Sequence, residues 1–192
     1  MARNRAFDYE EKLEKVRDLF WEKGYQATSM QDIVKTLQLN KSSIYNTYGN
    51  KQTLFLACLS DYAKMKTAQY KAAATHKDKA FAVLSHVVHD VMNQTIKDQK
   101  SCLIVRTIFE LGNSDEAVST LIKGNAWVLE GLFKDLLEKA QESKEIKQSI
   151  VPEVAAKYIL SSFSGFYKYY ILSGNKKEVK EMIDFMLAMM KE

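Results

Sequence analysis

Apolar residues recur every three or four positions along most of the chain, which is the spacing of one face of an α-helix. Short polar breaks separate these runs, and no stretch alternates for long enough to predict a strand. The runs occupy residues 9–23, 28–37, 41–48, 51–74, 78–98, 101–111, 114–142, 152–173 and 176–192. The sequence therefore predicts an all-α fold of about nine helices.

The second and third predicted helices form a pair near the N-terminus. Thr28 and Gln31 match a capping box that would begin the first of them, and Asn40 would cap the second. Ile44 and Tyr48 give the second helix one apolar side. Its remaining residues face outward: Lys41, Ser42, Ser43, Tyr45, Asn46 and Thr47. Two helices joined by a turn of about 3–4 residues, the second short and polar, are typical of a helix-turn-helix that enters the major groove.

This stretch also resembles the DNA-binding domain of the TetR family of ligand-responsive transcriptional regulators. The residues that carry the resemblance lie in roughly the first quarter of the chain: Gly24, Tyr25, Thr28, Ile33, Ile44, Tyr45, Tyr48, Gly49, Lys51 and Leu54. Three positions depart from the family pattern, since Gln38 replaces a turn glycine, Val34 a common alanine and Tyr48 a phenylalanine. A left-handed residue costs more without glycine, so we expect a slightly rebuilt turn at Gln38.

The resemblance implies roles for the outward-facing residues. Thr28, Tyr45 and Lys51 match family positions that hold DNA phosphates, and Thr47 lies beside them on the exposed side of its helix. A second group matches positions that face base edges or the adjoining backbone: Lys41, Ser42, Ser43 and Asn46. Phosphate contacts fix the register on the duplex, whereas Lys, Ser and Asn side chains can exchange hydrogen bonds with bases.

Composition and charge narrow the class of protein. The 192 residues include 46% hydrophobic and 27% charged residues and a single proline, which suits a helical protein of one or two domains. The net charge of +4 is modest for a nucleic-acid binder. No apolar run approaches the ~18–20 residues that cross a bilayer, and the N-terminus lacks a signal-peptide core, so we expect a cytoplasmic protein with no membrane partner. Cys58 and Cys102 suit a reducing compartment.

The resemblance also implies a division of the chain into a DNA-binding domain at 1–50 and a ligand-binding and dimerisation domain at 51–192. In the family, the last two helices pair with their copies in a second subunit. The final predicted helix offers one apolar face: Val179, Met182, Ile183, Met186, Leu187 and Met190. A terminal helix this apolar needs a partner, so we predict a homodimer through the eighth and ninth helices that binds a palindromic site in double-stranded DNA. The alternative is that this face completes the core of the monomer.

The resemblance places a small-molecule effector, of unknown identity, among the fourth to seventh helices. Its candidate lining is apolar and equally suited to a core: Phe81, Met92, Ile108, Phe109, Trp127, Leu129, Phe133, Phe166 and Tyr170. Arg106 and Glu110 would be polar handles. Cys102 begins a helix, where the backbone dipole raises thiol reactivity, and some electrophile-responsive TetR-like regulators resemble this chain there. Cys102 is thus either a sensor or an inert, packed cysteine.

No catalytic motif is found: the phosphate loop G-x-x-x-x-G-K-[ST], the G-x-S-x-G elbow and H-E-x-x-H are all missing. His86 and His89 with Asp90 are more typical of a solvated pair than of a metal site. We therefore predict no enzyme, cofactor or metal, and a DNA-binding transcriptional regulator, a repressor rather than an activator, released from its operator by a ligand. Two alternatives stay open: a helical enzyme or metal-dependent sensor domain, and a ligand-free DNA-binding adaptor.

Overall fold

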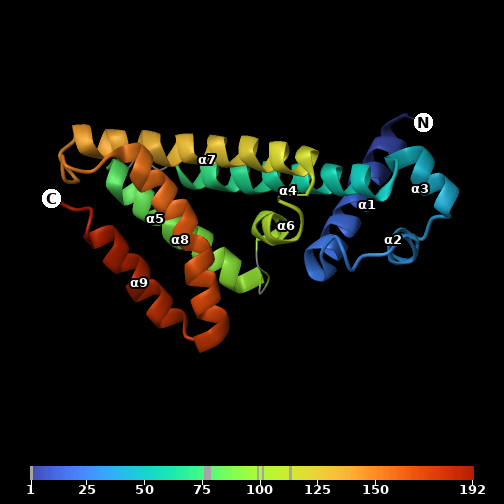
Figure 1. The fold of residues 1–192 in the computed structure, drawn as a ribbon. Helices are drawn as coiled ribbons and strands as arrows, with labels where there is room; N and C mark the ends of the chain where they lie inside the picture. The colour runs from blue at the N-terminus through green and yellow to red at the C-terminus, as the bar shows by residue number, and fades with distance from the viewer. Residues whose placement is uncertain (1, 76–78, 99, 101, 113) are drawn as a thin grey trace. The chain divides into compact units, whose positions relative to one another are not determined.

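A computed structural model describes residues 2–75, 79–98, 100, 102–112 and 114–192, with side chains from residue 9 onward (Figure 1). Within these ranges the chain is all α-helical, as predicted, apart from an isolated antiparallel bridge between Ile146 and Lys191. The helices are α1 (Ala2–Lys23), α2 (Met30–Leu37), α3 (Lys41–Tyr48), α4 (Lys51–Ala73), α5 (Ala80–Asp98), α6 (Leu103–Leu111), α7 (Glu116–Glu142), α8 (Pro152–Ser173) and α9 (Lys176–Ala188). None of them is long and apolar enough to cross a membrane.

Most helix ends lie within two residues of the predicted ones. Two ends differ by more, because α1 begins at Ala2 and α9 stops at Ala188. Beyond α9, the backbone N–H of Lys147 donates to the carbonyl of Met190 at 3.0 Å, which draws the final residues into the bridge with Ile146. The predicted starts at residues 78 and 101 lie outside the described residues.

The chain divides into two compact units. Unit 1 contains residues 1–65 and 102–123, and unit 2 contains residues 66–101 and 124–192. Both α4 and α7 contribute to each unit, whereas α6 belongs entirely to unit 1. The predicted functional boundary after residue 50 stays a prediction.

Unit 1 has its own core, built on α1 and the first half of α4. Phe20 and Phe55 pack edge to face with ring centroids 4.9 Å apart, and both are buried. Burying a side chain of this size stabilises the fold by roughly 1.5–3 kcal/mol. Arg17 ties the two helices together, since its Nη1 donates to Asp61 Oδ2 at 2.8 Å. Cys58 is fully buried, and burial raises the pKa of its thiol far above the usual range, so it is an unreactive core residue.

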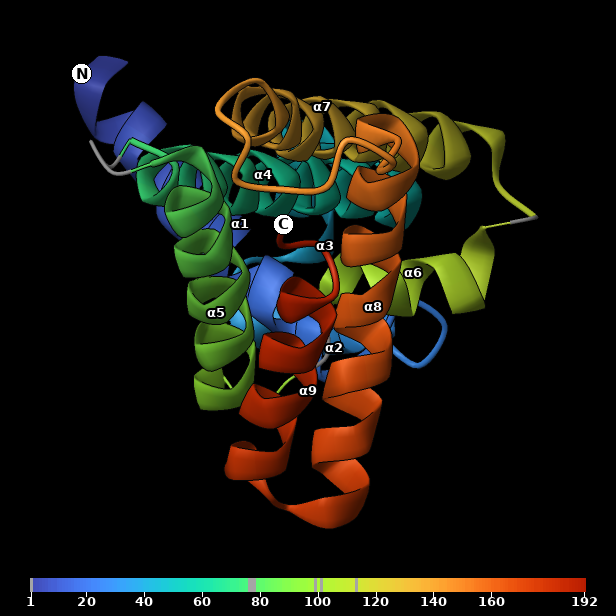
Figure 2. The ribbon, with the colours of Figure 1, turned by 90° about the vertical axis from the view of Figure 1, so that its left-hand side faces the viewer.

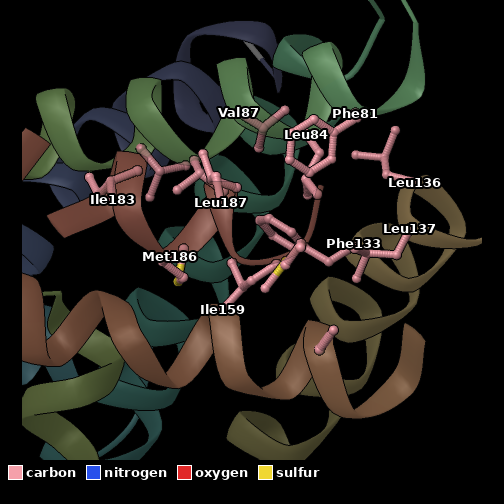
Figure 3. Packing of buried hydrophobic residues seen from close by; sticks show 14 of the residues in the cluster. Phe81, Leu84, Val87, Phe133, Leu136, Leu137, Ile159, Ile183, Met186 and Leu187 are labelled. Carbon is pink, nitrogen blue, oxygen red and sulfur yellow. The ribbon is translucent and has the colours of Figure 1, made fainter. Parts of the chain in front are cut away.

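Unit 2 is a layer of α5, α8 and α9 packed with the second part of α7 (Figures 2 and 3). Phe133 of α7 lies in its centre, completely buried, with its ring 6.2 Å from Phe163 and 6.3 Å from Tyr70. The structure corrects the prediction for the last helix. Five of the six residues of its predicted partner-seeking face are buried in this core instead: Val179, Ile183, Met186, Leu187 and Met190.

The apolar face of α9 thus completes the core of the chain itself, which was the alternative interpretation. A different face stays exposed on α9 and its C-cap residue: Met182, Phe185 and Met189. Exposed residues on α8 follow the helical repeat as well: Val154, Tyr158, Gly165, Tyr169 and Leu172. We call these eight residues the α8–α9 surface. Tyr169 Oη donates to Glu178 Oε2, which joins the two helices on this side.

Candidate DNA-binding surface

The N-cap of α2 lies one residue later than the sequence suggested. Ser29 is the N-cap, and its Oγ accepts from the backbone N–H of Asp32 at 3.1 Å, while Asp32 Oδ2 accepts from the backbone N–H of Ser29 at 2.9 Å. The predicted capping box of Thr28 and Gln31 is therefore wrong. Its physical cause is that the Thr28 side chain is buried and donates to the carbonyl of Gly24 at 2.6 Å, so it cannot cap α2.

The aspartate of this capping box, Asp32, also forms an ion pair. Lys23 Nζ lies 2.8 Å from Asp32 Oδ1, and this lysine, together with the hydroxyl and N–H of Ser29, holds the pKa of Asp32 far below its usual range. A lowered carboxylate pKa gives stability that is present above the unfolded value and lost as the pH falls through the folded one. The start of α2 therefore keeps its cap at neutral pH and loses it only in acid.

The turn between α2 and α3 keeps a left-handed residue although glycine is missing. Gln38 is the C-cap of α2, with φ 54° and ψ 38°, and its N–H donates to the carbonyl of Val34 at 2.9 Å. The turn at this residue therefore retains the conformation that a glycine would favour. The side chain at Gln38 adds a steric cost to the turn.

Replacing Gln38 by glycine is expected to raise the free energy of unfolding by about 0.5–1 kcal/mol, because glycine accepts a left-handed backbone without that cost. The gain is reduced by the greater freedom of glycine in the unfolded chain. Urea denaturation measures the change. Gln31→Gly is a matched control, since Gln31 is exposed within α2 and should lose about 1 kcal/mol. If Gln38→Gly and Gln31→Gly lowered the free energy of unfolding equally, the left-handed conformation of Gln38 would be contradicted.

The α3 helix presents a polar outer face on an apolar base. Asn40 caps it, with Oδ1 accepting from the backbone N–H of Ser43 at 2.8 Å. Ile44 and Tyr48 are buried, and the Tyr48 ring stacks on Tyr9 with centroids 4.8 Å apart. The side chains left at the outer face are Lys41, Ser42, Tyr45, Asn46 and Thr47, with Ser43 half-buried beside them. The structure thus gathers on one helix six of the eight residues predicted to contact DNA.

Lys51 stands at the first position of α4, directly after the turn that ends α3. Gly49 makes this turn with φ 77°, a left-handed value that favours glycine. Asn50 Oδ1 accepts from the backbone N–H of Thr53 at 2.9 Å and caps α4. Lys51 Nζ lies 4.3 Å from the centroid of the Tyr25 ring, and partial burial lowers its pKa. A lysine at a helix N-terminus that rests on an aromatic ring suits a phosphate contact.

Thr28 differs from the other predicted DNA-contacting residues. Its side chain is 1% exposed and its hydroxyl is engaged with Gly24, so this group is not presented to solvent. The sequence did not distinguish Thr28 from Ser29, because both residues are good N-caps that precede an acceptor by three positions. Gly24, with φ 86°, lies four residues before Thr28, and its carbonyl accepts the hydrogen bond of the buried hydroxyl.

The predicted ligand-binding residues fall into both units. Four of them belong to unit 1: Cys102, Arg106, Phe109 and Glu110. Six belong to unit 2: Phe81, Met92, Trp127, Phe133, Phe166 and Tyr170. Of the second group, all except Trp127 lie in the unit 2 core or pack against it. Trp127 is exposed on α7, and in unit 1 Phe109 is 86% exposed on α6.

Arg106 and Glu110 contact the DNA-binding region rather than one another alone. Arg106 donates to three backbone carbonyls at the end of α1, and Glu110 accepts from the backbone N–H of Tyr25 and Gln26. No residue pattern indicates these contacts, because the partners are separated by more than 80 positions and are backbone atoms. The assignment of both residues to a ligand site stays a prediction.

Cys102 is the N-cap residue of α6, half-buried, and its side chain makes no capping hydrogen bond. His89 Nε2 lies 2.9 Å from Asp184 Oδ1, which gives this histidine a partner on α9. Within the described part of the chain, no group of three or more His, Cys, Asp or Glu residues is placed to hold a metal ion.

Comparisons with known proteins agree with this geometry. Residues 13–58 match the model of the bacterial regulatory proteins of the tetR family, a span that runs from the second half of α1 to the first part of α4. The chain is 27% identical over 152 residues to YezE, a helix-turn-helix transcriptional regulator of Bacillus subtilis strain 168, covering 76% of both chains. It is 26% identical over 148 residues to the repressor ComR of Escherichia coli K12, covering 76% of this chain and 70% of ComR.

A solved structure extends the likeness to the whole fold. The regulator FadR from Bacillus subtilis, determined in complex with stearoyl-CoA, superposes with a TM-score of 0.75 at 17% identity, covering 94% of this chain and 96% of FadR. The family match falls on the helices that carry the polar α3 face, and the relatives span most of the chain. This chain is a member of the TetR family of DNA-binding transcriptional regulators.

Proposed function

We propose that the chain is a homodimeric repressor whose α3 helices bind a palindromic DNA site in the bacterial cytoplasm and whose ligand releases it. The observation that carries the DNA-binding part is the outer face of α3, where Lys41, Tyr45 and Asn46 project from a capped helix on a buried base. Two such helices, about one helical turn or roughly 34–36 Å apart, would read the two half-sites. The relative ComR is a repressor, which supports this direction of regulation.

The α3 residues divide into two roles in this proposal. Tyr45 is 43% exposed, and Lys41 Nζ lies 5.8 Å from its ring centroid, so the pair offers a hydroxyl and a cation to the phosphates. Ser43 and Asn46 would face base edges, where Asn can bond adenine in the major groove. Thr28 contributes through the position of its backbone, since its hydroxyl is engaged within the protein.

Substitutions on α3 test this division. Tyr45→Ala is expected to weaken binding about tenfold on every duplex, because phosphate contacts carry no sequence information. Tyr45→Phe keeps the ring and isolates the hydroxyl. Asn46→Ala should instead change the preference among duplexes by roughly 1–3 kcal/mol at one base pair. Binding to a panel of single-base variants, selected from random duplexes by the wild type, measures both. An equal loss on every duplex for Asn46→Ala would contradict its role.

The effector site is proposed for unit 2, within the region of Phe81, Met92, Phe133, Phe166 and Tyr170. Such a lining suits a ligand with a large apolar part. FadR, which shares the fold, was solved with stearoyl-CoA, and this supports a ligand site in a protein of this architecture. A ligand would release DNA by favouring a dimer with another half-site spacing, to the extent that it binds the two states differently.

One observation favours a second candidate, the ligand-free adaptor. Phe133 and Met92 are buried to within about 1% and pack directly in the unit 2 core, which is the arrangement of a closed interior. An adaptor would repress through DNA binding alone or recruit a protein. Screening compounds for release of a bound duplex separates the two candidates, since only the ligand-responsive protein would dissociate from the duplex when a compound binds.

A further inference from the structure

A pair of side chains on α6 holds the end of α1. Helix α6 is anchored in the unit 1 core by Leu103, Thr107 and Leu111, which are all buried. Arg106 and Glu110, four residues apart on another side of this helix, form an ion pair with Arg106 Nε 2.9 Å from Glu110 Oε1. We call this pair the clasp. Because its helix is fixed in the core, the clasp presents its charged atoms at a defined position.

The guanidinium of Arg106 satisfies the carbonyls that end α1. The last four carbonyls of a helix have no partner within the helix. Here the carbonyl of Phe20 accepts from the backbone N–H of Gly24 at 2.8 Å. Arg106 donates to the other three, at 3.3 Å to Trp21, 2.9 Å to Glu22 and 2.7 Å to Lys23. A cation at this end also interacts favourably with the helix dipole.

The carboxylate of Glu110 holds the next part of the turn. Its Oε2 accepts from the backbone N–H of Tyr25 at 2.8 Å and of Gln26 at 3.3 Å. Burial alone would raise the pKa of Glu110, but the hydrogen bonds from Arg106 and from these two amides lower it. Glu110 is therefore ionised at neutral pH and is a strong acceptor for the turn. The clasp thus engages the backbone on both sides of Gly24.

Gly24 fits the clasp closely. A Cβ atom at this position would lie 2.1 Å from Glu110 Oε1 and 2.8 Å from Arg106 Nη2. The positive φ of Gly24 and this close approach both require a residue without a side chain. The turn and the clasp are therefore matched to each other.

The turn that the clasp holds supports predicted phosphate contacts. Tyr25 underlies Lys51, whose Nζ lies 4.3 Å from the ring centroid, and Thr28 bonds the carbonyl of Gly24 directly before α2 begins. We propose that Arg106 and Glu110 are positioning residues for DNA recognition, which hold residues 21–26 in the shape that presents Lys51 and the start of α2 to the phosphates. This inference rests on the proposed role of Lys51, and it makes α6 part of the DNA-binding apparatus.

Salt-dependent binding of the full chain to a wild-type-selected duplex tests the clasp. Glu110→Gln and Arg106→Met are each expected to weaken binding about tenfold. Each should also make the binding constant less dependent on salt, reducing the magnitude of the slope of log K against log salt by about one, because a phosphate contact is lost. Removing an acidic charge near DNA would by simple electrostatics strengthen binding, so a loss in Glu110→Gln points to position. Arg106→Lys should recover part of the loss. Lys134→Met, which removes one exposed charge in unit 2, should leave the slope unchanged.

A second measurement keeps the clasp testable if a variant is unstable. Amide hydrogen exchange should show faster exchange of Tyr25 and Gln26 in Glu110→Gln than in wild type, with α3 unchanged. A wild type that binds duplex while Glu110→Gln binds equally or more tightly with an unchanged slope would overturn the clasp alone. A wild type that binds no duplex would overturn the role of Lys51 and the clasp with it.

Discussion

Replacing Phe185 by aspartate is expected to halve the mass of the protein in solution and to weaken its binding to a palindromic site by about a hundredfold or more. Phe185 is 67% exposed and stands between Met182 and Met189 on the α8–α9 surface. We propose that this exposed apolar stripe is the interface between two subunits, because contiguous exposed apolar residues are typical of protein contacts. A charge in the middle of an isologous interface is introduced twice, once by each subunit, and both copies would be desolvated.

The loss in DNA affinity is expected because a dimer carries two linked DNA-binding surfaces, which we call its two heads. In a dimer, binding of the second head is intramolecular, so the affinity for a full site exceeds that for a half-site by a factor of about 10²–10⁴. Phe185→Asp should therefore bind full and half sites equally and as weakly as a single head. Sedimentation and titration against both duplexes measure the two effects together.

Lys177→Glu is the control for this prediction, since it changes a charge on a largely exposed residue of the same helix that is not part of the α8–α9 surface. It should leave both mass and affinity close to wild type. If Phe185→Asp kept the mass of the wild type, the dimer would use another surface, and if the wild type were itself monomeric the dimer proposal would be wrong.

Truncating Phe133 to alanine is expected to lower the free energy of unfolding by about 3–5 kcal/mol, the usual cost of removing a large aromatic side chain from a packed core. Phe133 is completely buried among α5, α7, α8 and α9, with Leu84, Ile159 and Leu187 in the same cluster (Figure 3). The surrounding side chains belong to three other packed helices and to α7 itself. They could not move far enough to fill the cavity that the ring leaves. Chemical denaturation monitored by circular dichroism measures the loss.

Phe109→Ala removes the same side chain from an 86% exposed position and should change stability by no more than about 0.5 kcal/mol. The size of the loss for Phe133→Ala also tests whether unit 2 holds an open cavity beside this ring. A residue that lines an open ligand cavity has fewer packing partners, so a loss below about 1.5 kcal/mol for Phe133→Ala would point to a cavity beside the ring. A loss in the expected range favours the closed interior of an adaptor, or a ligand site that opens only on binding.

Much of the fold could be predicted because local chemistry ends the helices. Gly24 and Gly174 stop α1 and α8 with positive φ, Asn40 caps α3 and Pro152 opens α8, and each of these signals lies within a few residues of the structure it determines. The polar face of α3 was predictable for the same reason. Once Ile44 and Tyr48 are buried, the helical repeat directs the residues between them outward.

The remaining features depend on what a residue meets across the fold. The periodicity of α9 revealed its apolar face but could not show whether that face meets another subunit or α5 of the same chain, because both would bury Ile183 and Leu187 equally well. Arg106 is a similar case. Its partners are carbonyls, which every residue carries, so no residue type near α1 indicates that an arginine of α6 completes the helix end.

The discontinuity of unit 1 has a consequence for how the protein is made. The helix-turn-helix is encoded in the first part of the chain, but the core it packs on includes Leu103, Leu111 and Val118, which are synthesised much later. A nascent chain of which only α1 to α4 have left the ribosome lacks these side chains and the clasp. The carbonyl groups at the end of α1 can bond Arg106 only after α6 has also been synthesised. We therefore expect α1 to α4 to be incompletely folded without α6, and this chain to acquire its affinity for DNA only after α6 has left the ribosome.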